Sequence, residues 1–234
     1  MPTRILAVAS QKGGSGKSTL VTGLAASFIS SGLSVCVLDA DSPQHTLLRW
    51  WEVASTLPHF APLTVEPARQ ADLHGRALPA ADLVLIDCPG RVDAIVRSAL
   101  VAADALVVPL QPTYPDSWAL AGLVESVAAA VQARKRALPG FVVLNRIKRG
   151  TRLAKQAEGL GQLLPAGFTL LDARLRDLQG FQVAMGAGDT PLGLEPGGPA
   201  AEDLSAVAAE LLKHVRIPDE KRREKSAARP AAAR

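Results

Sequence analysis

The sequence has few of the residues that build disulfide-stabilised or membrane-spanning proteins. Only two cysteines occur among its 234 residues, Cys36 inside an apolar run and Cys88 beside the end of another. They provide neither a disulfide framework nor a paired-cysteine metal site, so we expect both to be small buried residues. No uninterrupted apolar run approaches the roughly 18 residues of a membrane-spanning helix, and no signal-type segment precedes the first predicted strand. A cytoplasmic protein is therefore expected.

Aromatic residues are also scarce, at 4% of the chain, and the four histidines have no partners at the spacing of a metal site or catalytic triad. We therefore assign the histidines no chemistry. Three of the aromatic residues are Trp50, Trp51 and Trp118. Their large apolar bodies favour a place in the core or at an interface over stacking on a base.

The hydrophobic content is 48%, which is enough for a buried core in a chain of this length. The length fits one large α/β domain or at most two small ones, and we expect residues 1–216 to form a single domain. From Ile217 onward the sequence IPDEKRREKSAARPAAAR has hardly an apolar residue other than alanine. Residues 217–234 are therefore predicted to be a disordered, basic and alanine-rich tail.

Apolar runs typical of strands alternate with stretches of helical periodicity. The runs occupy residues 5–9, 33–39, 63–66, 81–87, 104–110, 140–145 and 168–172. This alternation predicts an α/β fold with a mostly parallel, twisted sheet flanked by helices on both faces. Ligands in such sheets lie beyond the carboxyl ends of the strands, where Asp39, Asp41, Asp87, Gln111 and Asn145 fall.

The stretch SQKGGSGKST (residues 10–19) departs from the common phosphate loop G-x-x-x-x-G-K-[ST], because Gln11 stands where the first glycine is expected. Glycines let consecutive backbone N–H groups face an anion, and the helix that follows adds the positive end of its dipole. Lys17 would reach the β- and γ-phosphates, and the Ser18 hydroxyl would ligate Mg²⁺. The nucleotide-binding residues predicted in the loop are Gly13, Gly14, Ser15, Gly16, Lys17, Ser18 and Thr19.

KGGSGKST resembles the deviant Walker A signature of the ParA and MinD superfamily of P-loop ATPases, and the resemblance extends over residues 4–212. In that family the extra lysine, here Lys12, reaches across a nucleotide-sandwich dimer to the partner's phosphates. The resemblance implies ATP and Mg²⁺ as cofactors, a weak intrinsic ATPase activity and a homodimer that forms with ATP. Lys12 would be catalytic, because charge supplied in trans accelerates related phosphoryl transfers by about 10³- to 10⁵-fold.

VCVLDADSPQ (residues 35–44) is similar to the family's second strand, which ends in an Asp-x-Asp-Pro-Gln type motif. The resemblance implies that Asp41 positions or polarises the attacking water and that Asp39 lies nearer the metal. Ser42 is inserted between Asp41 and Pro43, which departs from the family's pattern. This insertion leaves open the alternative that Asp41 only caps a helix.

LVLIDCPG (residues 83–90) resembles the family's Walker B strand, whose aspartate, here Asp87, holds a water on Mg²⁺. The alternative is that Asp87 only forms a turn. VVLNRIKRGTRLAKQ (residues 142–156) resembles the strand on the adenine side, where Asn145 would bind the base, although an asparagine after a strand is as often a cap. The predicted metal-binding residues are Ser18, Asp39 and Asp87.

Some branches of the family fit poorly. The few residues before the loop leave no room for an N-terminal helix-turn-helix domain, so a short form is expected. MinD-like members end in an amphipathic helix that binds the membrane, whereas the end of this sequence lacks a large apolar face, so no membrane partner is expected. Cys36 and Cys88 do not match the paired cysteines of the iron-protein relatives.

Basic residues are concentrated in the second half of the chain. Residues 1–120 carry 8 basic and 10 acidic side chains, and residues 121–234 carry 18 and 12. A stretch of the second half without an acidic residue contains Arg134, Lys135, Arg136, Arg146, Lys148, Arg149, Arg152 and Lys155. Solvated helix faces normally mix charges of both signs, so this stretch favours contact with the nucleic-acid backbone without base reading.

The sequence is therefore identified as a member of the ParA family of partition ATPases. Such a protein would bind nonspecific DNA as an ATP-bound dimer, associate with the nucleoid, and be released when a ParB-like or other centromere-binding activator stimulates hydrolysis. One alternative is a MinD-like positioning ATPase for a cargo other than DNA. Another is a metabolic P-loop kinase or ligase, for which the sequence shows no small-molecule pocket.

Overall fold

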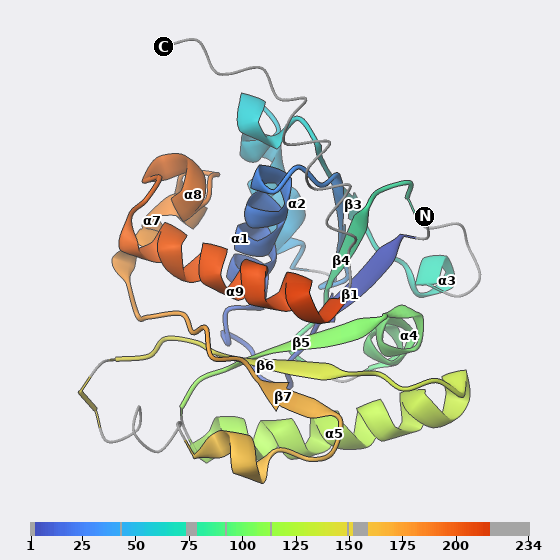
Figure 1. The fold of residues 1–234 in the computed structure, drawn as a ribbon. Coiled ribbons are helices and arrows are strands. Elements are labelled where there is room, and N and C mark those ends of the chain that lie inside the picture. Colours follow the sequence, from blue (N-terminus) through green and yellow to red (C-terminus); the bar gives the residue numbers. More distant parts are fainter. Residues whose placement is uncertain are drawn as a thin grey trace.

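The computed structural model describes residues 3–42, 44–73, 79–91, 93–112, 114–148, 150–151 and 159–215. Seven strands form one sheet in these ranges, and each pair of neighbouring strands is parallel. The strands are β1 (Arg4–Val8), β2 (Val35–Asp39), β3 (Leu63–Pro67), β4 (Leu83–Asp87), β5 (Ala105–Leu110), β6 (Gly140–Leu144) and β7 (Phe168–Leu170). Their order across the sheet is β3-β2-β4-β1-β5-β6-β7 (Figure 1), which confirms the predicted parallel sheet.

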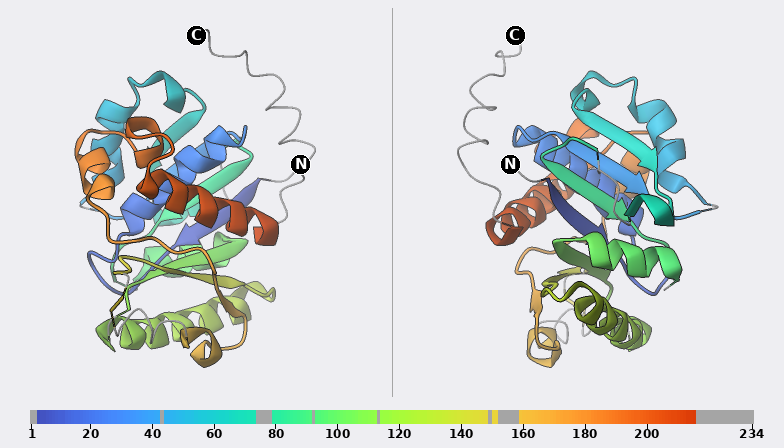
Figure 2. Two further views of the ribbon diagram at one scale, coloured as in Figure 1. Left: turned by 60° about the vertical axis from the view of Figure 1, so that its left-hand side comes forward. Right: turned by 90° about the vertical axis from the view of Figure 1, so that its right-hand side faces the viewer.

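Helices cover both faces of the sheet, as predicted (Figure 2). One face carries α1 (Lys17–Ser30), α2 (Thr46–Ala54), α7 (Gln179–Gly186), α8 (Pro191–Leu194) and α9 (Pro199–Val215). The other carries α3 (Gln70–Leu73), α4 (Ala94–Ala102) and α5 (Tyr114–Arg134). Two short 3₁₀ turns complete the described elements, η1 (Pro58–Phe60) and η2 (Leu160–Leu163).

The central strands are apolar along most of their length, as expected where both faces of a strand are buried. Leu6 and Val8 of β1 belong to the core that packs on α1, whereas Ala7 belongs to the core that packs on α4 and α5. All three are completely buried. A strand covered on both faces has no polar side to present, so it shows continuous hydrophobicity in place of alternation.

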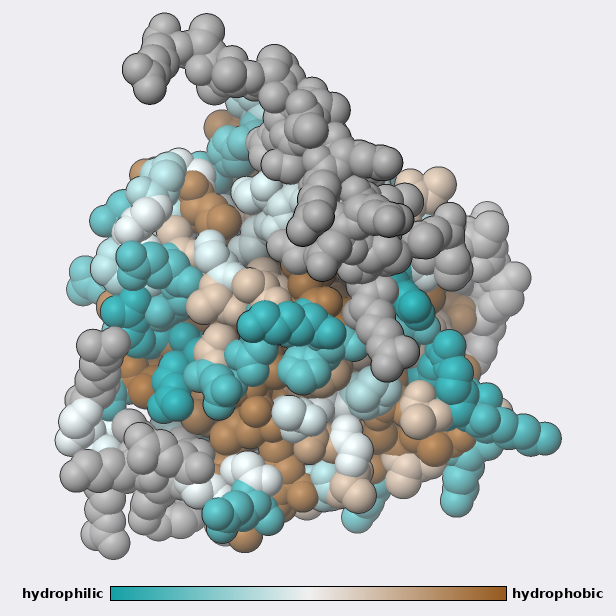
Figure 3. Space-filling view, viewed as in Figure 1, coloured by the Kyte–Doolittle hydropathy of each residue, from teal (hydrophilic) through white to brown (hydrophobic). Residues whose placement is uncertain are grey.

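The last described helix, α9, crosses the sheet beside α1 (Figure 1). Its buried side includes Leu204, Val207 and Leu211, while its outward side shows hydrophilic residues mixed with less polar ones in the surface view (Figure 3). This is the pattern of a helix with one face on a core. None of the described helices is long and apolar enough to cross a membrane.

Two strands begin two residues later than the sequence pattern predicts. Residues 33–39 and 81–87 were both expected to be extended, but pairing starts at Val35 and Leu83. Before these positions the Ser34 hydroxyl donates to Asp82 Oδ2 at 2.8 Å, and the Asp82 N–H donates to Ser34 Oγ at 3.0 Å. These side-chain bonds occur beside a backbone bond, in which the Asp82 N–H also donates to the Ser34 carbonyl at 3.1 Å, so the regular ladder begins only after them. The predicted tail, residues 217–234, lies outside the described residues.

Candidate nucleotide-binding site

The predicted site residues come together at the carboxyl ends of β1, β2, β4 and β6. The glycine loop connects β1 to α1. Asp39 and Asp87 are the last residues of β2 and β4, and they are paired with each other in the sheet register. Asn145 directly follows β6. Because parallel strands end at the same edge, segments far apart in sequence form one site there.

The glycine loop presents positive charge on its inner side. Gly14 and Gly16 have φ values of 73° and 91°, in the left-handed region that glycine adopts without strain. Lys17 begins α1, is buried, and its Nζ donates a hydrogen bond to the Lys12 carbonyl at 3.2 Å. The first turn of α1 contains no acidic residue. The helix start and the Lys17 ammonium therefore form a place suited to an anion such as phosphate.

Two residues from other strands brace this loop. Gln111, at the end of β5, donates from Nε2 to the Gly14 carbonyl at 3.2 Å. Gly90, which follows β4, lies so close that a Cβ there would come within 3.0 Å of the Gly13 backbone nitrogen. Motif spacing gives no sign of either contact, because the residues involved are far apart in sequence. Gln111 stood out only as a polar residue at the end of an apolar strand.

The Ser18 hydroxyl and Asp87 form a candidate cation site. Ser18 Oγ donates to Asp87 Oδ2 at 2.7 Å, and the buried Asp87 Oδ1 has no hydrogen-bond partner among the described residues. Burial raises the pKa of Asp87 to about 7, against the effect of the Ser18 hydrogen bond, and the charge of Asp39 adds to the rise. A bound cation would stabilise the ionised Asp87 carboxylate against burial and against the charge of Asp39. A hydroxyl beside a carboxylate with an open oxygen suits Mg²⁺, so the residues present fit the predicted ion.

The rest of the coordination would come from elsewhere. The described residues contain no group of three or more histidine, cysteine or acidic side chains that could hold a metal together. Mg²⁺ commonly keeps several waters and binds through one or two carboxylates together with substrate phosphates. The geometry is therefore suited to a metal–nucleotide complex and not to a metal bound by protein alone.

Asp39 makes contacts that its motif does not predict. It is fully buried, and Oδ1 accepts a hydrogen bond from the Asp41 N–H at 3.0 Å. Oδ2 accepts from the N–H groups of Leu47 and Leu48, both at 3.1 Å. These two N–H groups belong to the first turn of α2 and lack partners within the helix. Asp39 therefore anchors α2 to the end of β2, in addition to lying beside Asp87.

Asp41 lies in the loop between β2 and α2. It is partly exposed, and its negative charge is among the causes that raise the pKa of Asp87. Its carbonyl accepts a hydrogen bond from the His45 N–H at 2.8 Å. Ser42, the inserted residue, is exposed, and Pro43 lies outside the described residues. Asp41 therefore acts electrostatically on Asp87, while its role with water stays a prediction.

Asn145 joins the end of β6 to the glycine loop. It is buried, its Nδ2 donates to the Ser15 carbonyl at 2.8 Å, and its Oδ1 accepts from the Arg146 N–H at 2.8 Å. A Cβ at Gly16 would collide with the Asn145 amide. One amide hydrogen and one acceptor position of Asn145 are therefore used within the protein. Its expected contact with a base stays a prediction.

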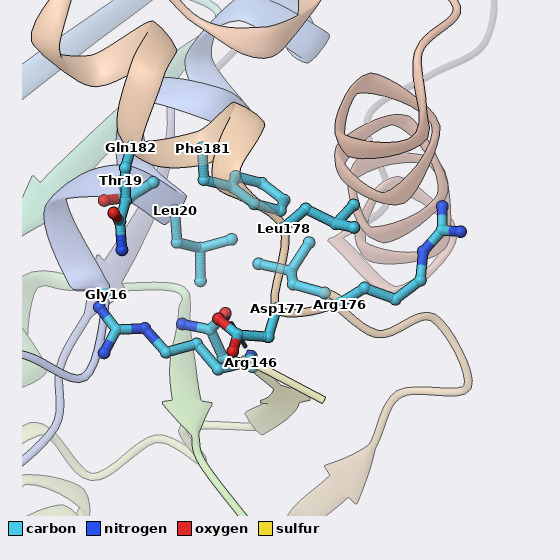
Figure 4. A pocket seen from close by; sticks show the side chains of 11 residues that line it. Gly16, Thr19, Leu20, Arg146, Arg176, Asp177, Leu178, Phe181 and Gln182 are labelled. Carbon is cyan, nitrogen blue, oxygen red and sulfur yellow. Dashed lines mark hydrogen bonds between the residues drawn. The ribbon is translucent and has the colours of Figure 1, made fainter. Parts of the chain in front are cut away.

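A cavity opens beside Asn145 on the α7 side of the loop (Figure 4). Arg146 borders it from the end of β6, and Phe181 borders it from α7. Its lining residues are Gly16, Thr19, Leu20, Asn145, Arg146, Leu175, Arg176, Asp177, Leu178, Phe181 and Gln182. The sequence analysis did not predict that residues after β7 line this cavity, because they fall in an irregular segment without a recognisable motif.

The predicted DNA-binding residues divide into two groups. Arg134 is the last residue of α5, and Lys135 and Arg136 follow it before β6 begins, so the three lie at the amino edge of the sheet. Arg134 Nη1 donates to the Leu100 carbonyl at 3.1 Å, and Arg136 Nη2 lies 3.1 Å from Asp104 Oδ1. These two arginines therefore tie α5 to α4 and to the start of β5. Lys135 is exposed.

The two described members of the second group, Arg146 and Lys148, follow β6 at the carboxyl edge of the sheet, beside the candidate site. Arg146 is exposed, and Lys148 Nζ lies 3.3 Å from Asp177 Oδ2. Five residues of β6 separate this edge from the other, which corresponds to about 17 Å at the usual rise of a strand. Arg149, Arg152 and Lys155 lie outside the described residues. One basic stretch of sequence therefore does not form one surface.

Comparison with known proteins agrees with this geometry. The family described as "CobQ/CobB/MinD/ParA nucleotide binding domain" matches residues 6–189. The chain is 28% identical over 213 residues to "Maintenance of carboxysome distribution protein A" of Halothiobacillus neapolitanus, covering 88% of this chain and 95% of that protein. It is 32% identical over 187 residues to "Chromosome-partitioning ATPase Soj" of Thermus thermophilus, covering 66% and 74%.

The fold is similar to that of a solved relative as well. The septum site-determining protein MinD of Pyrococcus horikoshii, solved with Mg-ADP, superimposes with a TM-score of 0.70 at 18% identity, covering 92% of this chain and 98% of that one. The family match extends from β1 through the glycine loop, the two aspartate-ending strands and the cavity residues. The chain therefore belongs to the CobQ/CobB/MinD/ParA family of nucleotide-binding domains.

Proposed function

We propose that this chain is a ParA-type ATPase that binds ATP with Mg²⁺ and hydrolyses it to ADP and phosphate. The observation that carries the proposal is the placement of Lys17, Ser18 and Asp87 around the inner side of the glycine loop. An ammonium, a helix start and a cation site in one place suit the β- and γ-phosphates of a nucleotide. The relatives named as partition ATPases support a role in DNA segregation.

Each site residue has a proposed part in this reaction. Ser18 and Asp87 would hold Mg²⁺, which when bound neutralises charge on the phosphates. Lys17 and the loop N–H groups would hold the phosphate oxygens, and Asp41 would orient the attacking water. Asn145 would keep the loop in position through Ser15 and offer its remaining amide hydrogen to the base.

The proposed active form is a dimer closed through Lys12. This residue lies in the loop that Gly90 and Gln111 brace, at the open carboxyl edge of the sheet. A partner subunit that meets this edge would receive the Lys12 charge on its γ-phosphate. Hydrolysis would then depend on dimerisation, because the charge that stabilises the transition state comes from the other subunit.

We propose that nonspecific DNA binds at the carboxyl edge through Arg146 and Lys148. The basic residues next to them in the sequence, Arg149, Arg152 and Lys155, are proposed to contribute to the same contact. Closing a dimer at this edge would bring two such groups together, so the DNA affinity would depend on ATP. Lys148 is 69% exposed, and its pair with Asp177 is a surface ion pair of little energy, so a phosphate can replace it. A protein bound to DNA in this way would associate with the nucleoid.

A second candidate is the positioning of a cargo other than DNA. It is favoured by the carboxysome-distribution relative, because this chain spans 95% of that protein. The two candidates share the ATP-driven dimer and differ in the partner that stimulates hydrolysis. A centromere-binding protein of the ParB type would be the partner in the first, and an adaptor on the cargo in the second.

Analytical sedimentation tests the proposal directly. The protein is spun with ADP, ATP or a slowly hydrolysed ATP analogue, each with and without duplex DNA. We expect a monomer with ADP, a dimer with the analogue, and co-sedimentation with DNA only in the dimer. A phosphate-release assay with DNA alone checks that turnover needs no small-molecule co-substrate. A chain that stays monomeric with the analogue, or needs such a co-substrate, would favour the kinase or ligase alternative.

A further inference from the structure

Helix α2 begins on the phosphate side of the candidate site and packs beside α1, β2 and β3. At its start, Asp39 accepts hydrogen bonds from the N–H groups of Leu47 and Leu48, and the His45 N–H donates to the Asp41 carbonyl. The loop that carries Asp41 is therefore held at one end by β2 and at the other by α2. Any shift of α2 relative to the sheet would move this loop.

The buried side of α2 is bonded to a segment far along the chain. Trp50 is 5% exposed, and its Nε1 donates a hydrogen bond to the Asp189 carbonyl at 3.1 Å. The Trp50 ring packs edge-on against Phe60, with centroids 5.2 Å apart. An indole N–H that is buried with a partner fixes both orientation and distance. Trp50 thus joins α2 to the turn that contains Asp189.

Asp189 is held in this turn by further bonds. Its Oδ1 lies 2.9 Å from His59 Nε2 and accepts the Thr190 N–H at 2.7 Å. Its own N–H donates to the Ala184 carbonyl at 3.0 Å, which closes the end of α7. Asp189 therefore connects the α2 and η1 side of the fold to α7 with well-defined geometry.

The other end of α7 borders the candidate nucleotide cavity. Phe181 and Gln182 lie in the first half of this helix and line the cavity, next to Thr19 of α1 (Figure 4). A continuous path of hydrogen bonds and helix thus runs from the cavity through α7, Asp189 and Trp50 to α2. It ends at the loop of Asp41, on the phosphate side of the site.

We infer that Trp50 is a positioning residue that couples the base-side cavity to the loop carrying Asp41. The inference rests on the proposed ATP-binding function. A base that settles against α7 stabilises the position of Asp189, and the Trp50 hydrogen bond passes that restraint to α2. Loss of this one bond should weaken nucleotide binding and turnover by roughly 2- to 10-fold, the range for a single buried hydrogen bond.

The test compares Trp50→Phe with Trp51→Phe. Trp51 is the next residue of α2, is only partly buried, and serves as a matched control for the change from indole to phenyl. Both variants are assayed for ADP affinity, for affinity to inorganic triphosphate, and for ATP turnover at saturation. Trp50→Phe should lose ADP affinity and turnover but keep its affinity for triphosphate, which has no base. Trp51→Phe should stay within about twofold of wild type, below the effect of one hydrogen bond.

Thermal melts separate this inference from a purely structural role, which would lower the melting temperature without changing binding by the folded protein. If Trp50→Phe does not fold, His59→Phe, which removes the bond to Asp189 Oδ1 at a partly exposed position, should show the same losses. Folded variants with wild-type ADP affinity and turnover would overturn the inference. If the wild type does not hydrolyse ATP, the proposed function fails, and the ADP affinities alone still decide the coupling.

Discussion

At the scale of single residues, Gln11 shows how the loop between β1 and α1 accommodates a residue other than glycine at its first position. Its side chain packs against Gly122 of α5, where an added Cβ would overlap it. Gln11 is also absent from the described residues with positive φ. Glycine is required only where φ is positive or where another group approaches closely. Gln11 has no positive φ, so its position does not require glycine, whereas Gly14 and Gly16 do have positive φ.

Substituting the two lysines of the loop, Lys12 and Lys17, should impair different steps of the proposed reaction. Lys17 points into its own loop, so Lys17→Ala should lose triphosphate binding. Lys12 is proposed to serve the partner subunit, so Lys12→Ala should still bind ATP as a monomer but neither dimerise nor hydrolyse it. The expected loss of turnover is about 10³-fold or more, as for charges supplied in trans. Equilibrium binding of a fluorescent ATP analogue and sedimentation measure the two effects.

Lys12→Arg is the control for this experiment, because it keeps the charge and changes the shape of the donor. We expect it to retain part of the dimerisation that alanine abolishes. Normal ATP-dependent dimerisation of Lys12→Ala would contradict the role in trans.

At the scale of elements, α2 depends on a carboxylate that the sequence motif assigns to the metal. Asp39→Ala removes the acceptor of three backbone N–H groups in a buried place. The loss of these charge-assisted bonds should exceed the relief of repulsion with Asp87. We expect the free energy of unfolding to fall by about 2–3 kcal/mol. Urea denaturation followed by circular dichroism measures this.

Asp41→Ala is the matched control, two residues away and partly exposed. It should leave the free energy of unfolding within about 0.5 kcal/mol of wild type, as at most exposed sites. If Asp41 orients the water, the variant should also accumulate an ATP-bound dimer that turns over slowly. Wild-type turnover of Asp41→Ala would mean that another residue orients the water, and the Ser42 insertion would be the first explanation to examine. Equal stability of both variants would contradict the anchoring role of Asp39.

At the scale of the whole molecule, DNA binding should be nonspecific and require ATP. Neutralised phosphates release counterions, so contacts with roughly four to six phosphates predict a slope of about −4 to −5 for log affinity against log salt concentration. ADP should release the DNA, because one subunit presents only half of the surface. Titrations of two unrelated duplexes with each nucleotide measure both expectations. A strong preference for one duplex would contradict binding by backbone contacts alone.

Lys148→Glu and Lys135→Glu separate the two basic groups. Both lysines are exposed, and the charge change is the same, but they lie at opposite edges of the sheet. Lys148→Glu should weaken binding to every duplex alike while ATP binding is retained, and Arg149→Glu with Arg152→Glu should do so more strongly. Lys135→Glu should have little effect. The reverse result would place the DNA surface at the amino edge.

Local patterns predicted the features that depend on neighbouring residues. The strand, glycine loop and helix around Lys17 were recognisable because the spacing of glycine, lysine and serine is set by the geometry of one phosphate group. The strands were recognisable because both of their faces are buried. The first residues of β2 and β4 were not recognisable, since the Ser34 and Asp82 side chains bond each other just before the regular ladder begins.

The sequence by itself determined the parallel sheet and the signature loop. Runs of apolar residues predict the sheet, and the spacing of a few glycine, lysine and serine residues predicts the loop. The tertiary structure alone decided that Asp39 anchors α2, that Asn145 holds the loop, and that Trp50 meets Asp189. It also divided the basic stretch between two edges, because β6 runs through the middle of it. These relations depend on the order of the strands across the sheet, and local sequence patterns do not predict that order.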